Sequence, residues 1–452
     1  MVATSKERSH GYRQRVVEAW EEEKAARKFD VSLEGGFLPD HCVQRLPLAY
    51  EPWERILDDL PHLNRTGQLF RSIERLRCID VDDLEEAQLK RAYIVLCMLL
   101  HSYVNGPTVS WERLREHESE ESSHAAQDAN YVRHPSVPAQ ISTPLVDVST
   151  KLGLPPVLTA AIDLWNWKLK RNEQGRSSVE ALETISSMTG TSTESFFHLI
   201  PCAIQARLGP LVAAMFYAPC FILSHISKDD KGGEEAAGVA VREAGQLLED
   251  LRDALQDCKS MMKQLSELVH ADVFFHVYRP LLTGFWPDGV LLKTSEEGEE
   301  GTGDDEGVWS RAKGPSAGQS AVFIMIDLFL GVRHEVLMSD FQREVVEEYL
   351  PRKHREFMKK FEEEVKVHGG IRQAAERAKT RLLPHAQDLS DRYNDCVRSL
   401  QAFRRVHLSF ASSYLQATAT GTGATEFQVL LREAIVATST EQGGGGGGGG
   451  GG

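Results

Sequence analysis

One helical face near the end of the chain carries a single histidine among aromatic residues. In FRRVHLSFASSYL (403–415), Phe403, His407, Phe410 and Tyr414 recur at the spacing of one face of an α-helix. An imidazole in this setting is either a core histidine satisfied by a neighbour or the axial ligand of a haem, whose flat apolar body needs such a face. Arg404 would then lie near the ligand or near a haem carboxylate.

Two further stretches carry groups that could bind a substrate. DVFFHVYRPLLTGFW (272–286) reads as an aromatic helix with one arginine, Arg279. That arginine either reaches solvent from a core helix or pairs with a substrate carboxylate at a pocket mouth. ATGTGATEF (419–427) lacks the GK[ST] ending of a nucleotide-binding loop, so a flexible lid or a helix cap fits it better.

The stretch KGPSAGQSAVF (313–323) fits the G-x-S-x-G pattern of a serine hydrolase around Ser316. That nucleophile needs an apolar strand just before it, whereas an acidic, glycine-rich loop precedes this serine. The sequence therefore favours a loop that caps the helix starting near Gln319, with backbone N–H groups free to meet an anion. The histidines also predict no local zinc site, because the sixteen of them form no HExxH or HxxxH pair and no cluster with cysteine.

Composition bounds the protein class. The 452 residues are 41% apolar and 26% charged, which is ordinary for a globular protein, and the net charge of −15 argues against a nucleic-acid partner. Seven scattered cysteines without a CxxC pair, several in apolar runs, predict buried free thiols in a reducing compartment. The N-terminus has no secretory apolar core, and the apolar run 196–224 is interrupted by Gln205, Arg207 and two prolines. We expect a cytoplasmic protein with no membrane span, and a buried helix, kinked or broken, over that run.

Helical periodicity dominates the chain, and no sustained alternation indicates strands. We predict an all-α fold with a small N-terminal helical domain (31–150) and a large C-terminal helical domain (151–440). A charged extension (1–30), loosely helical or disordered, precedes them, and a disordered tail of ten glycines (443–452) follows. The expected helices are 83–104, 152–170, 196–224, 236–269, 271–284, 319–335, 339–365, 370–417 and 424–438.

Taken together, these stretches resemble the indoleamine 2,3-dioxygenase family, in its fungal-type form, from about residue 31 to 438. The matching blocks, in the family's order, are GFLPDHCVQRLPLAYEPWE, LGLPPVLTAAIDLWNW, ESFFHLIPCAIQAR, FFHVYRPLLTGFW, GPSAGQSAVFIMIDLFLG, FRRVHLSFASSYL and GTGAT. The family's enzymes use haem to open the indole ring of tryptophan. The resemblance implies that the small domain covers the distal side of a haem b held by the large domain.

The resemblance also assigns residues. It makes His407 the proximal haem ligand, with Asp327 and Arg404 as an ion pair beside it. Arg279 would hold the substrate carboxylate. The remaining substrate-site residues would be Phe197, Phe274, Phe275, the loop Ser316, Ala317 and Gly318, and Thr422 in the mobile loop GTGAT.

The distal helix departs from the family's pattern, which usually has two phenylalanines and a serine there. In one register Phe197 takes the first phenylalanine, His198 replaces the second and Pro201 replaces the serine; in the other, Phe196 and Phe197 match and Ile200 replaces the serine. We prefer the first register because it needs no gap. The helix containing LTAAIDLW is also one residue short, with alanine where the family often has tyrosine.

The implied reaction inserts O₂ across the indole C2–C3 bond of L-tryptophan or a related indole, giving N-formylkynurenine. It needs an electron donor to keep the iron ferrous and no protein acid or base. We expect a monomer. The alternative is a haem protein of the same family that binds another indole or O₂ with little tryptophan turnover.

Overall fold

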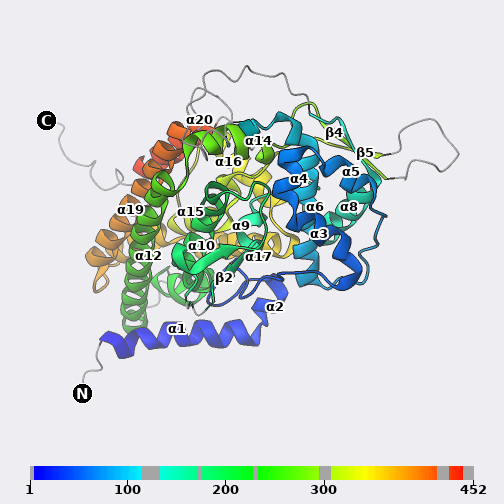
Figure 1. The fold of residues 1–452 in the computed structure, drawn as a ribbon. Helices are drawn as coiled ribbons and strands as arrows, with labels where there is room; N and C mark the ends of the chain where they lie inside the picture. Colours follow the sequence, from blue (N-terminus) through cyan, green and yellow to red (C-terminus); the bar gives the residue numbers. More distant parts are fainter. Residues whose placement is uncertain are drawn as a thin grey trace.

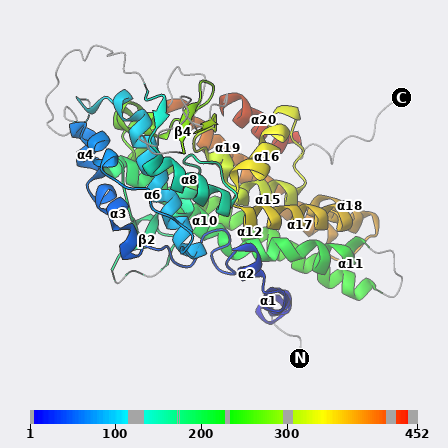
Figure 2. The same ribbon diagram turned by 90° about the vertical axis from the view of Figure 1, so that its right-hand side faces the viewer.

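The computed structural model of the protein describes residues 5–112, 114, 133–171, 173, 175–227, 233–294, 307–414 and 427–440. Within them the chain is mostly helical, so the predicted all-α class is confirmed. Figure 1 shows α3 to α6 and α8 gathered on one side, α12, α19 and α20 on the other, and α10 between them. In the turned view of Figure 2, α11, α17 and α18 lie at the end of the molecule away from α3 and α4. The poly-glycine tail and Thr422 lie outside the described residues.

The helices of the first half are α1 (Ser5–Glu22), α2 (Ala25–Phe29), α3 (Glu51–Asp58), α4 (Leu60–Thr66), α5 (Leu69–Glu74), α6 (Glu86–Asn105), α8 (Ala139–Leu152), α9 (Ala161–Trp165) and α10 (Ser192–Ala218). Those of the second half are α11 (Ser224–Ser227), α12 (Glu234–Leu268), α13 (Ala271–Val273), α14 (Arg279–Leu282), α15 (Ala321–Leu330), α16 (Val336–Glu344), α17 (Arg352–His368), α18 (Ile371–Thr380), α19 (Ala386–Tyr414) and α20 (Phe427–Thr440). Three π-helical turns continue helices: η4 (Pro219–Leu223), η5 (Phe274–Tyr278) and η7 (Val345–Tyr349).

Two small sheets accompany the helices. In the first, β4 (Val290–Lys293) pairs in parallel with β1 (Ser136–Val137) and antiparallel with β5 (Gly307–Ser310). In the second, β2 (Trp167–Leu169) pairs with β3 (Leu182–Thr184). Strands β1 and β4 belong to different predicted domains yet pair with each other, and α8 runs across residue 150. Regular secondary structure therefore crosses the predicted boundary, and the division into two domains stays a prediction.

Helix α10 occupies the centre because it is apolar on all sides. It contacts α9, α12 and α15 and continues as a helix past Pro201 and Pro210 into the π turn η4. By length and composition, the run Ser192–Ser227 in the described part of the chain could cross a membrane, but 72% of its most apolar window is buried inside the fold. The sequence therefore predicted the buried core helix correctly, although helical structure persists through both prolines.

Some predicted helices are wrong in extent. The segment 152–170 is helical only over α9 after Leu152, because Pro155 and Pro156 supply no N–H groups, and Trp167 enters β2. The predicted helix 339–365 divides before Pro351. The predicted helix 370–417 divides at Leu382 and His385, which both adopt positive φ.

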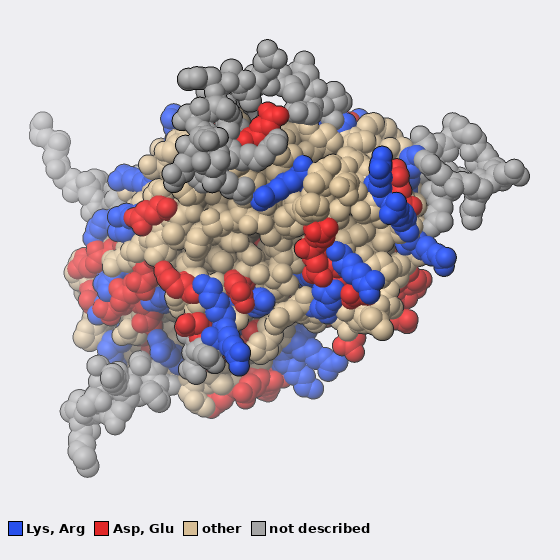
Figure 3. Space-filling model, in the orientation of Figure 1, with Lys and Arg blue, Asp and Glu red and all other residues tan. Residues whose placement is uncertain are grey.

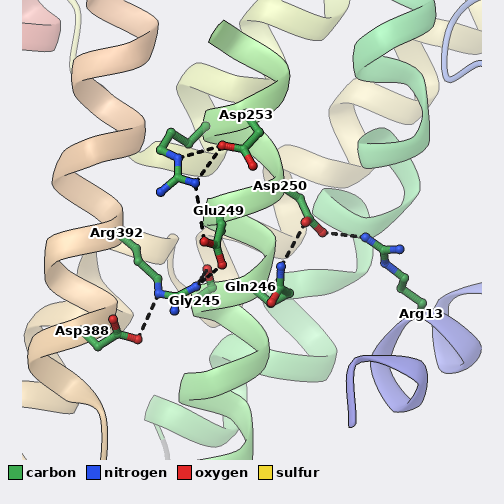
Figure 4. Close-up of polar contacts among 9 residues, drawn as sticks. Arg13, Gly245, Gln246, Glu249, Asp250, Asp253, Asp388 and Arg392 are labelled. Atoms are coloured by element: carbon green, nitrogen blue, oxygen red, sulfur yellow. Dashed lines mark hydrogen bonds and ion pairs between the residues drawn. The ribbon is translucent and has the colours of Figure 1, made fainter. Parts of the chain in front are cut away.

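The charged N-terminal extension is more ordered than the sequence suggested. Tyr12, Val16 and Trp20 of α1 are buried against the rest of the protein. On the outside, Arg13 of α1 pairs with Asp250 of α12 at 2.7 Å, and Arg392 of α19 pairs with Glu249 of α12 (Figure 4). Acidic and basic side chains interleave over the face in Figure 3. Each exposed ion pair of this kind contributes little to the free energy of folding. Burial of the apolar face of α1 therefore holds this helix in place.

Candidate functional site

Helix α19 presents His407 in a form suited to binding a metal. The side chain is half-buried, and no hydrogen bond to it occurs among the described residues. Burial, with Arg404 nearby, lowers the pKa of His407 to about 4, so the imidazole is neutral at pH 7 and keeps a lone pair. On the same face Phe403 stacks on Phe323 of α15 with centroids 4.7 Å apart. The histidine is therefore not a core residue satisfied by a neighbour.

Asp327 of α15 and Arg404 of α19 form a buried ion pair one turn from His407. Both carboxylate oxygens accept from Nη2 of Arg404, at 2.5 and 2.6 Å. The carboxylate also contacts Nε2 of His334 at 2.8 Å and accepts from Nε2 of Gln342 at 3.0 Å. Burial alone would raise the pKa of Asp327, but Arg404 and His334 lower it to about 2. The predicted pair is present, and His334 and Gln342 are partners that no sequence pattern indicated.

Substituting Asp327→Asn should destabilise the fold by about 3 kcal/mol, because it leaves the buried charge of Arg404 without a counter-charge. Since the pKa of Asp327 is lowered, its contribution is present above about pH 4 and is lost as the pH falls towards 2. The measurement is the urea midpoint of far-UV circular dichroism, which should be lower for the variant and less dependent on pH across that window. Asp253→Asn, at an exposed pair with Arg252, is the matched control. Equal midpoints for wild type and Asp327→Asn would refute the stabilising role.

The predicted substrate residues lie on and beside the π turn η5. Phe274 is buried with its ring 4.7 Å from that of Phe197 on α10, and the guanidinium of Arg279 lies 5.4 Å from the ring of Phe275. Tyr414, two turns after His407 on α19, contacts Phe274 with centroids 6.0 Å apart. This contact connects the predicted substrate helix to the helix of His407. Phe197, which takes a phenylalanine position in both registers, is thus placed against Phe274.

His101 of α6, which the sequence analysis missed, fixes the position of the Arg279 helix. Its Nδ1 lies 2.7 Å from the carbonyl oxygen of Leu281, and its Nε2 lies 2.9 Å from the backbone N of Leu158. Burial lowers the pKa of His101 to about 4, so the ring is neutral. Its Nδ1–H therefore donates to Leu281, and its Nε2 accepts from Leu158. The only sequence signal was a histidine inside an apolar helix.

The loop Ser316–Gly318 is held from two sides. Gln319 accepts from the backbone N of Ala160 at 2.9 Å and donates to the carbonyl of Gly314, while Gln205 of α10 donates to Ser320. The Oγ of Ser316 accepts from the backbone N of Gly318 at 3.3 Å. A serine hydrolase needs a histidine hydrogen-bonded to its nucleophilic serine. No histidine within the described residues forms a hydrogen bond with Ser316, so the hydrolase interpretation is disfavoured.

Gly318 has no room for a side chain. A Cβ at this position would lie 2.5 and 2.7 Å from ring atoms of Phe341. Gly318→Ala should therefore displace the loop and lower kcat/KM for the indole substrate by about tenfold or more, since small misplacements near the chemistry are costly. Steady-state kinetics test this. Gly11→Ala, at an exposed position of α1, is the control, and adding Phe341→Leu to Gly318→Ala should restore activity. Full activity of Gly318→Ala alone would contradict the tight fit.

Helix α10 corresponds to the predicted distal helix, and one of its two unusual residues, His198, belongs to a hydrogen-bonded polar array. His198 of α10 is buried, with Nδ1 2.5 Å from Oδ1 of Asp163 on α9 and Nε2 hydrogen-bonded to the hydroxyl of Tyr278 on η5. Pro201, half-buried one turn later, supplies no hydroxyl. The array was not predicted, because its members lie on three elements far apart in the sequence.

The family model for "Indoleamine 2,3-dioxygenase" matches residues 25–451. The chain belongs to the indoleamine 2,3-dioxygenase family. It is 30% identical over 393 residues to indoleamine 2,3-dioxygenase 1 of Mus musculus, covering 84% of this chain and 82% of that protein. It is 25% identical over 440 residues to an indoleamine 2,3-dioxygenase of Aspergillus nanangensis, covering 90% and 94%. A 6-hydroxytryptophan 2,3-dioxygenase of Fusarium equiseti is 27% identical over 405 residues, covering 87% and 86%.

Membership makes the protein a dioxygenase acting on tryptophan or another indoleamine, and the family depends on haem. The residues of this family member fit such a group. A haem iron needs one neutral imidazole, which His407 offers, and its ring needs flanking aromatic and aliphatic surface, which Phe403 and Phe410 help to provide. Because Arg404 is already bound to Asp327 and Thr438, its charge acts on His407 from a fixed position.

Proposed function

We propose that this protein is a haem b dioxygenase that adds O₂ across the indole C2–C3 bond of L-tryptophan and releases N-formylkynurenine. The contact between Phe274 and Tyr414 carries the proposal, because it joins the helix of the substrate arginine to the helix of the haem ligand. Family membership supports the reaction class.

Each side chain has a limited task in this reaction. Haem iron, when bound, supplies the activation of O₂. Phe197 and Phe274, whose rings pack against each other, form the aromatic surface that holds the indole ring, and Arg279 binds the carboxylate. His407 would hold the iron, while Asp327 and Arg404 keep the helix and the imidazole in position. Ser316 and Gly318 close the side of the site next to α9 and exclude water.

The conditions of the reaction belong to the proposal as well. We propose a monomer in the cytoplasm that receives electrons from a separate donor to keep the iron ferrous. The support is chemical: all seven cysteines are free thiols, which suits a reducing compartment. Four of them are buried as predicted (Cys97, Cys202, Cys258 and Cys396), whereas Cys78 and Cys220 are exposed.

The test is the absorption spectrum of the reduced, haem-loaded protein with and without L-tryptophan, followed in air by detection of N-formylkynurenine. Product formation with a haem Soret band supports the proposal. Spectral shifts on adding an indole without any product would instead favour a haem protein that binds an indole with little turnover.

A further inference from the structure

A continuous hydrogen-bonded array crosses the predicted distal side. It runs from the hydroxyl of Tyr278 through both nitrogens of His198 to Oδ1 of Asp163. Tyr278 is fully buried and His198 nearly so, whereas Asp163 keeps 19% of its side chain exposed. Only the Asp163 end of the array can therefore meet a ligand.

The hydrogen positions in the array follow from what each group can donate. The buried hydroxyl of Tyr278 has no acceptor other than His198 in the described part of the chain, so it donates to Nε2. Since Nε2 of His198 accepts this hydrogen bond, Nδ1 carries a hydrogen and donates it to Asp163. All donors point one way, and Asp163 is the final acceptor.

Asp163 has capacity for a further donor. Its Oδ2 forms no hydrogen bond among the described residues, and burial raises the pKa of this carboxyl group. A carboxylate with little access to water binds an added O–H or N–H donor more strongly than an exposed one does. A C–H group in the same place would leave the oxygen unsatisfied.

The neighbours of the array are the predicted substrate residues. His198 follows Phe197, whose ring contacts Phe274 and lies 5.9 Å from that of Tyr278. Tyr278 directly precedes Arg279. On the other side Asp163 lies one helical turn after Ala160, whose N–H is bound by Gln319 of the Ser316 loop. Asp163 is thus connected through Ala160 of the same segment to the loop, and through His198 to the aromatic pair that would hold the indole.

We propose that Asp163 is a specificity-determining residue that selects indoles carrying a hydrogen-bond donor, such as a hydroxyl group, on the six-membered ring. The proposal rests on the proposed indole cleavage and refines its substrate class. Asp163 accepts the hydroxyl proton in a hydrogen bond, and His198 and Tyr278 hold the carboxylate in place. No proton or electron is transferred in this step.

The experiment compares L-tryptophan with its four isomers hydroxylated on the six-membered ring, and with the methyl ether of the preferred isomer. Values of kcat/KM are measured for the haem-loaded wild type, Asp163→Asn, Asp163→Val and the exposed control Asp253→Asn. Binding to the ferric protein is measured separately by calorimetry without O₂, so affinity is read independently of turnover.

We expect at least one hydroxylated isomer to be preferred over L-tryptophan and over its methyl ether. Asp163→Val should lower that preference about tenfold or more, because valine offers no acceptor to a donor on the substrate ring. Asp163→Asn should lower it too, and Asp253→Asn should not change it.

Three results would overturn the inference. One is no preference for any hydroxylated isomer in the wild type. Another is equal loss of activity on all substrates in both Asp163 variants, which is what a purely structural role gives. The third is unchanged relative affinities by calorimetry. Absence of cleavage of every indole by haem-loaded wild type would instead refute the proposed function itself.

Discussion

Replacing His407 with alanine should remove haem binding and, with it, dioxygenase activity. The imidazole is neutral, forms no hydrogen bond within the described residues and shares its helix face with aromatic side chains, so no other function in the fold accounts for it. Loss of an outer partner of a metal ligand typically weakens a metal site by about 10–100-fold, and loss of the ligand itself should exceed that. The Soret band of purified protein and a haem titration measure the effect.

His62→Ala is a suitable control because this histidine is exposed on α4. His407→Gly gives a sharper test, since added imidazole can occupy the space and restore the Soret band. A purely structural histidine would not be rescued in this way. An unchanged Soret band in His407→Ala would show that the iron ligand lies elsewhere.

Replacing Arg279 with methionine should lower kcat/KM for L-tryptophan by about 100-fold, mainly through KM. A guanidinium binds a carboxylate through paired charge-assisted hydrogen bonds, which methionine cannot supply. Phe275, 5.4 Å from the guanidinium, supports the arginine at one face of the π turn. Steady-state kinetics on L-tryptophan and on tryptamine, which lacks the carboxylate, measure the effect.

Tryptamine is the internal control of this experiment. The Arg279→Met variant should cleave it as slowly as the wild type does, because the lost interaction needs the carboxylate. Arg279→Lys should fall between wild type and Arg279→Met for L-tryptophan, since lysine keeps the charge but not the paired geometry. Equal losses on both substrates would assign Arg279 a role in folding instead.

Periodicity predicted the long helices well, because each buries a regular stripe. Helix α12 was expected at 236–269 and runs over Glu234–Leu268. The helix predictions fail where the apolar periodicity indicates a helix and a local residue such as proline is compatible with more than one backbone conformation. The expected helix 152–170 has Pro155 and Pro156 near its start, where proline is tolerated, yet Tyr93 binds the carbonyls of Pro155 and Val157 in a non-helical segment. Only the tertiary partner decides between these outcomes.

One part of the candidate site was predictable from the sequence, namely the part formed by a single histidine on one aromatic helix face. His407 and the aromatic face of α19 were visible from spacing, and Arg404 with Asp327 came from resemblance. The partners that complete the site were not visible. His334 reaches Asp327 only because Gly331 ends α15 with positive φ and turns the chain back. Asp163, His198 and Tyr278 are 35 and 80 residues apart in sequence, and only the packing of α9, α10 and η5 joins them.

The π turn η5 determines the direction in which Arg279 points. In a regular α-helix, residues five apart such as Phe274 and Arg279 would be separated by about 140° around the axis. In a π turn, each group bonds to the residue five positions away, so the two residues lie on nearly the same face. A π turn is an α-helix with one inserted residue. Deleting one residue between Phe275 and Tyr278 would restore the regular helix, and Phe274 and Arg279, then four positions apart, would still lie about 40° apart on one face. The π turn therefore accommodates one additional residue in this helix without separating recognition of the ring from recognition of the carboxylate.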